Sequence, residues 1–370
     1  MKPISLYFHI PFCKQKCKYC AFVSFTSKEK FFKSYISSIK KELDFYKKLL
    51  KNYEVRTIYF GGGTPSLLEA DMIPKLLEFV KNNFSIYKNT EITVEANPES
   101  FNLKKARMWK KAGVNRLSIG LQSDDDLVLK KLGRIHNYKK FLNAFNIAKK
   151  VGFSNINVDI IFGLENQTEK NVKELISKLA DLGVTHISAY GLQLEENTRL
   201  KQEVESGQVV LPSEERCVKI YNTACKELKK LGFIRYEISN FAKKGYESKH
   251  NLNYWARGEY LGIGVGAYSF SNGEHWENTS SLDEYLSGYQ RKNVEVETTK
   301  TAMEEMIMLA LRTEKGLDIN LFNSTFGNDF EILFKKQIEK LKAKKLIKIV
   351  KNHIKITNFE VSNQIIAEFF

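Results

Sequence analysis

The sequence has no long hydrophobic run and contains few cysteines, prolines or histidines. Its 370 residues include 5 Cys, 6 Pro and 6 His. No stretch approaches the roughly 18 consecutive apolar residues of a membrane-spanning helix. The opening residues, MKPISLYFHI, lack the basic segment followed by an apolar stretch that marks a secretory signal. We therefore expect a cytoplasmic protein, with peripheral contact at the inner face of the membrane left open.

The cysteines are too few and too unevenly spaced for a disulfide framework. Cys13, Cys17 and Cys20 lie close together, whereas Cys217 and Cys225 lie in a segment with a helical pattern. Cysteines outside a site are usually small core residues, and a reducing compartment keeps thiols reduced. We expect no disulfide bond.

Basic residues exceed acidic ones and give the chain a formal charge of +15. They are scattered along the sequence, which is more typical of solvated helix faces than of a binding patch. The charge alone identifies no partner, and we expect no nucleic acid.

The hydrophobic content of 43% is that of a folded protein. A chain of 370 residues is long enough for one large domain and one small domain.

Short apolar runs alternate with helical patterns over the first 190 residues. Because parallel strands joined by helical crossovers form an open sheet or a barrel, both with active sites at the C-terminal ends of the strands, we expect an α/β fold of one of these kinds. The predicted strands are residues 4–10, 55–60, 91–95, 115–119, 155–161 and 186–190.

The alternation stops after about residue 200. Helical patterns near 213–231 and 302–313 surround a glycine-rich and aromatic tract, 250–270, which we predict to be too irregular for a helix. The last residues predict helices and a short basic hairpin, 346–350 and 353–357. We divide the chain into a core barrel, an extension and a small α/β module of winged-helix type, at residues 1–230, 231–300 and 301–370.

Distinctive residues follow the ends of the predicted strands, so separate segments should converge on one edge of the sheet. The segment GGGTP has three glycines, which let the backbone approach a ligand closely and present N–H groups to it. The residues at this edge are the three clustered cysteines, GGGTP at 61–65, Glu95, Gln122, Asp159 and Tyr190.

The spacing Cys-x3-Cys-x2-Cys favours an iron–sulfur cluster. Three thiolates can hold three corners of a four-iron cluster and leave the fourth iron open, whereas a structural zinc ion needs four ligands. An amino acid could chelate the open iron through its amine and carboxylate. On these residues alone, zinc stays an alternative, and a zinc-bearing nucleic-acid-binding module is the remotest function that we consider.

Six motifs in order resemble the radical S-adenosylmethionine (SAM) superfamily, in the branch of oxygen-independent coproporphyrinogen III oxidase. They are YFHIPFCKQKCKYC, YFGGGTPS, VEANPES, RLSIGLQS, LGRIHN and NVDIIFGL. The resemblance implies a partial (β/α)6 barrel, a [4Fe-4S] cluster and SAM on its open iron, with an electron donor for the cluster. It assigns the cluster to Cys13, Cys17 and Cys20, the SAM contacts to Tyr7, Gly62, Gly63, Thr64 and Glu95, and a second SAM site to Gln122, Arg134 and Asp159.

Two of these residues also have ordinary structural interpretations. Arg134 could form a surface ion pair, and Asp159 could be a buried polar residue that caps a turn. Their spacing together with Gln122 favours the cofactor site.

Three features separate this sequence from the oxidases. Phe22 stands where the oxidases have a further cysteine, no N-terminal extension precedes the first predicted strand, and HNLNYW at 250–255 matches the HNxxYW motif of related haem chaperones. The match implies His250 as a haem ligand, and the faces of Tyr254 and Trp255 can stack on a porphyrin. We therefore expect a haem chaperone that serves apo-haemoproteins, membrane respiratory enzymes among them. Coproporphyrinogen III oxidative decarboxylation is the alternative, and enzymatic activity is left open.

Overall fold

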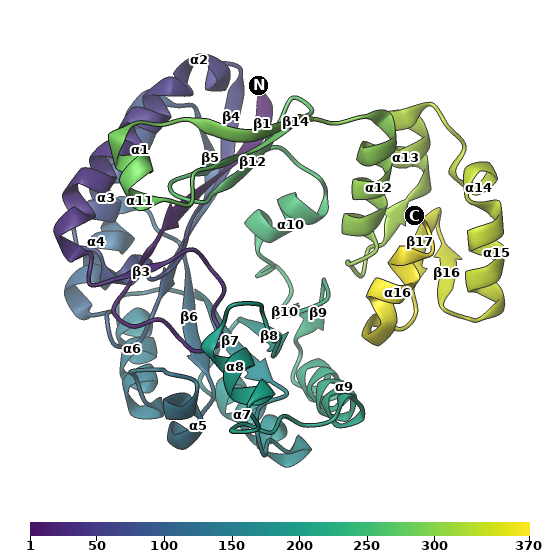
Figure 1. The fold of residues 1–370 in the computed structure, drawn as a ribbon, viewed down its shortest axis with the longest axis horizontal. Coiled ribbons are helices and arrows are strands. Elements are labelled where there is room, and N and C mark those ends of the chain that lie inside the picture. Colours follow the sequence, from purple (N-terminus) through teal and green to yellow (C-terminus); the bar gives the residue numbers. More distant parts are fainter.

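One mixed twelve-stranded sheet forms the centre of the larger part of the molecule. The structure is a computed structural model that describes residues 1–370 (Figure 1). The strand order is β14-β13-β12-β11-β1-β4-β5-β6-β7-β8-β10-β9. The six predicted strands all exist and are parallel neighbours: β1 (Lys2–Ile10), β4 (Tyr53–Gly62), β5 (Ile86–Ala96), β6 (Arg116–Gln122), β7 (Asn155–Phe162) and β8 (His186–Gly191).

Helices cover the outer face of these six strands (Figure 1). Their apolar residues recur with helical spacing and pack against the sheet, while side chains such as those of Asn102, Asn137 and Thr168 cap the helix N-termini. The helices are α1 (Phe32–Phe45), α2 (Lys47–Leu50), α3 (Met72–Asn83), α4 (Leu103–Ala112), α5 (Asp126–Lys131), α6 (Tyr138–Lys150) and α7 (Glu169–Asp181).

The inner face of the parallel strands is polar. Successive side chains of a strand point to opposite faces, so in β1 the buried Ile4, Leu6 and Phe8 alternate with Ser5 and Tyr7. Apolar residues therefore pack under the helices, and polar ones line the interior of the barrel. Two short strands, β2 (Phe12–Cys13) and β3 (Phe25–Thr26), flank the loop that follows β1.

The barrel is partial because its two edge strands do not pair with each other. β8 pairs antiparallel with β10 (Asn240–Ala242), and β1 pairs parallel with β11 (Tyr260–Ile263). The remaining elements of this part are α8 (Arg199–Glu205), α9 (Glu214–Lys230), β9 (Ile234–Arg235), α10 (Lys249–Trp255), β12 (Tyr268–Ser271), β13 (Glu274–Asn278), α11 (Leu282–Ser287) and β14 (Arg291–Val296).

The prediction that 250–270 contains no helix was wrong at its beginning. Helix α10 occupies the start of this tract and lies between β10 and β11 in the chain. The carboxylate of Glu91 on β5 accepts hydrogen bonds from the backbone N–H groups of Lys249 and His250, both at 3.1 Å. The helix also has a local N-cap, Ser248, whose hydroxyl accepts from the Asn251 N–H at 3.3 Å, and our prediction overlooked this signal. Only the contact with Glu91 comes from a distant strand, so the local pattern could not reveal that part.

The C-terminal residues form a separate module with its own hydrophobic core, which begins at Ile307. Its three-stranded antiparallel sheet has the order β15-β17-β16, and the predicted hairpin is present. The domain boundaries at 230 and 300 stay predictions. The elements are α12 (Thr299–Ala310), β15 (Leu317–Asp318), α13 (Ile319–Phe326), α14 (Phe330–Leu333), α15 (Lys335–Ala343), β16 (Ile347–Val350), β17 (His353–Ile356) and α16 (Ser362–Ala367).

No helix in the structure combines the length and the apolar character needed to cross a membrane.

Candidate functional site

A cavity of about 500 Å³ opens at the C-terminal ends of the parallel strands, and we call it the cysteine cavity. Its walls bring together segments that are far apart in the sequence, as the strand pattern predicted. Ten of the twelve predicted site residues line it: Cys13, Cys17, Cys20, Gly62, Gly63, Thr64, Glu95, Gln122, Arg134 and Asp159. The other two, Tyr7 and His250, do not.

The three clustered cysteines are half-buried free thiols in the loop that starts at the end of β2. Arg134 Nη1 donates to Cys17 Sγ at 3.5 Å, and Thr64 Oγ1 donates to Cys13 Sγ at 3.6 Å. Burial raises the pKa values of Cys13 and Cys20. At Cys13 the Thr64 hydroxyl and the Arg134 guanidinium offset part of this increase, and the thiolate is the form that binds iron.

The arrangement of these thiols fits a cluster better than a single zinc ion. Sulfurs on one tetrahedral zinc lie about 3.8 Å apart, given a Zn–S distance of about 2.3 Å. The sulfurs of the three cysteines do not all lie within 4.8 Å of one another. The ligand atoms of His275, Glu297 and Glu305, elsewhere in the structure, do. Cys217 and Cys225, on α9, supply no fourth ligand because neither lines the cavity. A larger inorganic centre matches this wider set of donors.

Arg134 connects three walls of the cysteine cavity. Besides Cys17, its guanidinium donates to the Gly120 carbonyl and to Asn97 Oδ1, both at 3.0 Å. It therefore ties the cysteine loop to β6 and to the segment after β5. This geometry disfavours the alternative of a surface ion pair.

Glu95 and Asp159 place two buried carboxyl groups in the same cavity. Glu95 accepts from Tyr59 Oη at 2.8 Å and from the Gly62 N–H at 3.2 Å, and burial with the nearby Asp159 raises its pKa to about 7. Asp159 accepts from Asn157 Nδ2 at 2.8 Å, and burial raises its pKa too. A carboxyl such as that of Glu95, whose pKa lies near neutral pH, can accept or donate a hydrogen bond to a polar ligand.

The glycines of GGGTP face the protein with their Cα hydrogens. Gly62 has a φ of +107°, and a Cβ there would lie 2.5 Å from His9 Cε1. At Gly63 a Cβ would lie 2.9 Å from the Ile10 carbonyl oxygen. Glycine is thus required at these positions because the loop packs tightly on β1. Close approach of a ligand would be a second reason.

Tyr7 and His250 lie beneath the cavity, in an aromatic layer with Tyr59. The Tyr7 and Tyr59 rings stack with centroids 6.0 Å apart, and Tyr59 and His250 stack at 4.9 Å. Tyr7 Oη pairs with His9 Nδ1 at 3.2 Å. Tyr7 therefore supports the cavity from below instead of lining it.

His250 lies on helix α10, where it is 1% exposed. Its Nδ1 pairs with Thr57 Oγ1 at 2.7 Å and its Nε2 with Tyr254 Oη at 3.0 Å. Burial lowers its pKa to about 3, so the ring is neutral. Both nitrogens are occupied, which favours an anchoring role, and ligation of haem iron stays a prediction that would require Tyr254 to move.

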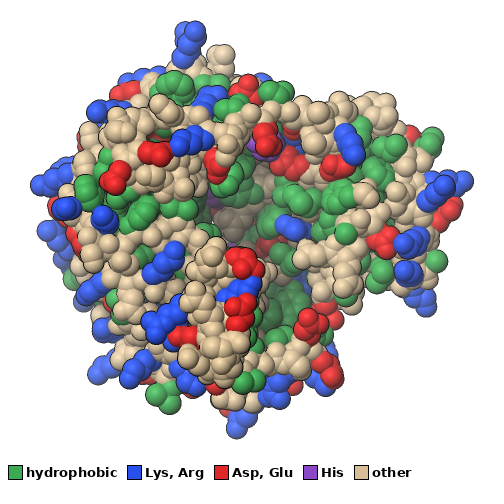
Figure 2. All heavy atoms as spheres, in the orientation of Figure 1, with side chains coloured by type: hydrophobic (Ala, Val, Ile, Leu, Met, Phe, Trp, Pro, Cys, Tyr) green, Lys and Arg blue, Asp and Glu red, His purple; other side chains and the backbone are tan.

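A second cavity of about 510 Å³ lies beside the first, and we call it the junction cavity. It is built where α10 and β11 meet α12 of the C-terminal module, and Figure 2 shows the surface hollowed there with hydrophobic side chains along one margin. The motif residues Asn251, Tyr254 and Trp255 line it. Tyr190, Ser239 and Asn251 belong to the walls of both cavities.

Arg116 is a cavity residue that our sequence analysis missed. It is 2% exposed, lines the cysteine cavity, and its Nε has no hydrogen-bond partner. Ser118 and Asn157, which bond to each other at 2.7 Å, were missed as well. A charged residue at the start of the otherwise uncharged strand RLSIGLQ was the available signal.

The profile of the Radical SAM superfamily matches residues 7–179, and that of the HemN C-terminal domain matches residues 298–358. Among solved structures, coproporphyrinogen III oxidase (HemN) from Escherichia coli superposes with a TM-score of 0.86 over 100% of this chain and 90% of that one. Its identity of 22% establishes the fold alone. The fold and the cysteine cavity together define a radical SAM protein.

Curated relatives narrow this class. The heme chaperone HemW of Lactococcus lactis is 35% identical over 100% of this chain and 97% of its own length. The heme chaperone HemW of Bacillus subtilis is 33% identical over 93% of this chain and 92% of its own. The chain belongs to the HemW family. The family implies a [4Fe-4S] cluster and SAM, and the predicted partial (β/α)6 radical SAM barrel is confirmed.

Proposed function

We propose that this protein binds haem and transfers it to apo-haemoproteins, and that a [4Fe-4S] cluster and SAM occupy its cysteine cavity. The observation that carries the proposal is the position of the HNxxYW motif, whose Asn251, Tyr254 and Trp255 line a cavity that shares a wall with the cysteine cavity. A porphyrin needs flat aromatic walls, which this motif supplies. The names of the relatives agree with this assignment.

In this proposal Cys13, Cys17 and Cys20 hold the cluster, which when bound supplies an electron to SAM. The loop from Gly62 to Thr64 and the carboxyl of Glu95 orient the cofactor. Arg134 keeps the cysteine loop in place through its bond to Cys17. The walls of the cavity keep bulk water away from the bound groups.

A second SAM molecule at Gln122, Arg134 and Asp159 is part of the proposal. These three residues line one cavity, and Gln122 adopts a φ of +72°, a conformation rarely populated without a local reason. The recipients, membrane respiratory enzymes among them, and the electron donor belong to the proposal too. Phe22, 67% exposed in the cysteine loop, is an apolar contact that a partner could cover.

The test compares haem transfer with porphyrinogen turnover. Anaerobically reconstituted protein should develop a Soret band on addition of haem and pass the haem to an apo-haemoprotein such as apomyoglobin. It should not convert coproporphyrinogen III when given SAM and a reductant. Formation of protoporphyrinogen IX, read by chromatography, would instead identify an oxidative decarboxylase.

A further inference from the structure

The junction cavity combines apolar and aromatic walls with a small number of charged groups. Its volume of about 510 Å³ lies within the range of about 300–1,000 Å³ typical of small-molecule sites. Aromatic side chains come from α10, β11 and β12, and Leu309 comes from α12. Tyr254 and Tyr260 pack edge to face with ring centroids 4.6 Å apart, which gives one wall a fixed shape.

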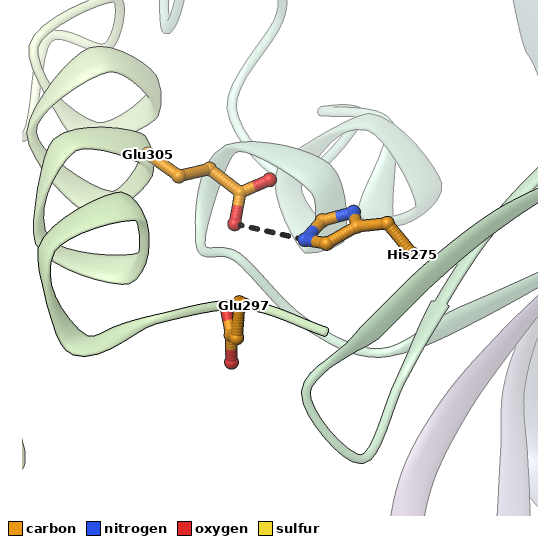
Figure 3. A group of neighbouring side chains, drawn as sticks. All are labelled: His275, Glu297 and Glu305. Atoms are coloured by element: carbon orange, nitrogen blue, oxygen red, sulfur yellow. Dashed lines mark ion pairs between the residues drawn. The ribbon is translucent and has the colours of Figure 1, made fainter. Parts of the chain in front are cut away.

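One of the two arginines in this wall is already neutralised. Arg257 forms ion pairs with Glu297 and Glu305, the latter at 2.6 Å, and lies 4.8 Å from the centroid of the Phe270 ring. Glu297, Glu305 and His275 form the cluster in Figure 3, where His275 Nε2 is 3.7 Å from Glu305. Because Arg257 supplies the positive charge between the carboxylates, this cluster needs no metal ion and fastens α12 to the sheet.

Arg312, just after α12, is the second arginine in the wall and has no acidic partner. No carboxylate lies within ion-pair distance of it, its Nε is buried without a hydrogen-bond partner, and its Nη2 reaches only Asn363 Oδ1 at 3.4 Å. Asn240 Oδ1 in the same wall is also buried and unpartnered. Arg312 has neither an acidic partner nor a full set of hydrogen bonds, so its guanidinium is available to an acceptor. Asn240 Oδ1 is itself an acceptor and would need a donor.

Glu237 is the remaining acidic group that could oppose an anion here. It is 1% exposed, and burial raises its pKa to about 7, so that its negative charge is reduced near neutral pH. Glu305 is balanced by Arg257. The net electrostatic preference of the cavity is therefore set by Arg312.

We propose that Arg312 anchors haem in the junction cavity by pairing with a ring carboxylate, with the macrocycle against Trp255 and Tyr260. The inference rests on the proposed function and names the anchoring residue of that site. A guanidinium is suited to this task because it binds a carboxylate with two parallel hydrogen bonds. A flat apolar ring with carboxylates at one edge matches a cavity that is aromatic on its walls and has one free cation.

The test measures binding of haem and of haem dimethyl ester, whose carboxylates are masked. Wild-type protein should bind haem more tightly than the ester. Arg312→Gln should weaken haem binding by about tenfold or more, the usual effect of losing a charge-assisted hydrogen bond, and leave ester binding unchanged. Lys315→Gln, a charge loss at an exposed position three residues away, is the matched control and should bind like wild type.

Arg312→Lys guards against misfolding, since it keeps the charge and should bind haem with intermediate affinity. If wild-type protein bound no haem, the proposed function and this inference would both fail. If wild type bound haem but Arg312→Gln bound it equally well, with no loss of preference over the ester, the junction cavity would be rejected and the proposed function would stand.

Discussion

The imidazole of His250 stacks on the ring of Tyr59, with centroids 4.9 Å apart and planes inclined by 25°. Tyr59 in turn donates to Glu95 in the cysteine cavity at 2.8 Å. A residue of the HNxxYW motif therefore lies one side chain away from a proposed SAM contact. The motif connects the two cavities through the aromatic layer of the barrel interior.

His250→Phe should keep the stacking on Tyr59 and remove both hydrogen bonds of the imidazole. The free energy of unfolding should fall by about 1–3 kcal/mol, because Tyr254 Oη loses its partner inside the protein. Urea denaturation would measure this loss. The Soret band of added haem should keep its position, whereas a shifted band would support the sequence prediction that His250 ligates iron.

A matched variant, Tyr254→Phe, removes only the hydroxyl that His250 contacts. Combined with His250→Phe it completes a double-mutant cycle. A coupling energy of about 1 kcal/mol is expected for one buried hydrogen bond. Strict additivity of the two single changes would argue against the contact.

Cys17→Ala should abolish the four-iron cluster, and Cys13→Ala and Cys20→Ala should do the same. Each of these thiols lines the cysteine cavity, and the chain has no other cysteine there to replace it. Iron and sulfide analysis after anaerobic reconstitution provides the measurement. Cys217→Ala and Cys225→Ala on α9 are the controls, and an unchanged cluster in Cys17→Ala would refute the assignment.

Gly62→Ala should weaken SAM binding by displacing the GGGTP loop. Its Cβ would approach His9 Cε1 to 2.5 Å, at a φ of +107° that side chains rarely adopt. Calorimetric titration with SAM should show a higher dissociation constant, with the cluster content unchanged.

Gly152→Ala is the matched control for this substitution. Gly152 has a similar φ of +91°, but a Cβ there meets nothing within 4 Å. Both variants carry the cost of a left-handed backbone, about 1–2 kcal/mol. Equal SAM affinity in the two would show that the contact with His9 is unimportant.

The contribution of Glu42 to stability should decline as the pH rises from about 5 to about 8. Its carboxyl is fully buried on α1, accepts from Tyr285, Asn278 and the Gly264 N–H, and has a pKa raised by burial to about 8 from its usual 4.5. Between these values the folded protein holds a proton that the unfolded chain releases. Folding therefore becomes less favourable with rising pH, by at most about 1.4 kcal/mol per pH unit for one proton.

Glu42→Gln removes this titrating group and should make the slope of the free energy of unfolding against pH more positive between about pH 5 and 8. Urea denaturation across this pH window measures the slope. The exposed Glu69→Gln is the control and should retain the wild-type slope. An equal slope in Glu42→Gln and wild type would show that Glu42 is ionised in the folded protein.

The barrel was predictable because its signals are local and repeated. Each parallel strand is a short apolar run followed by a helix, and the residues after each strand end necessarily meet at one edge. Cys13, Glu95 and Asp159 could thus be placed in one cavity without coordinates. Arg134 follows α5 instead of a strand, so its reach to Cys17 became visible only in three dimensions.

The failures depend in part on partners distant in sequence. Helix α10 has a local N-cap, Ser248, but its first N–H groups also bond to Glu91, more than 150 residues earlier, and this second contact has no local signal. His250 appeared to be an available ligand because Thr57 and Tyr254 could not be seen to occupy its ring. Hydrogen bonds between polar groups that are far apart in the sequence leave no local sequence pattern.

The wall shared by the two cavities provides a route by which a ligand in one could affect binding in the other. Tyr190, Ser239 and Asn251 face both spaces, so a molecule that reorients any of them on one side alters the affinity on the other. Linkage requires this influence to be reciprocal: whatever factor the first ligand applies to the second, the second applies to the first. Binding or release of a ligand in one cavity would then change the affinity of the other cavity for its ligand without any domain movement.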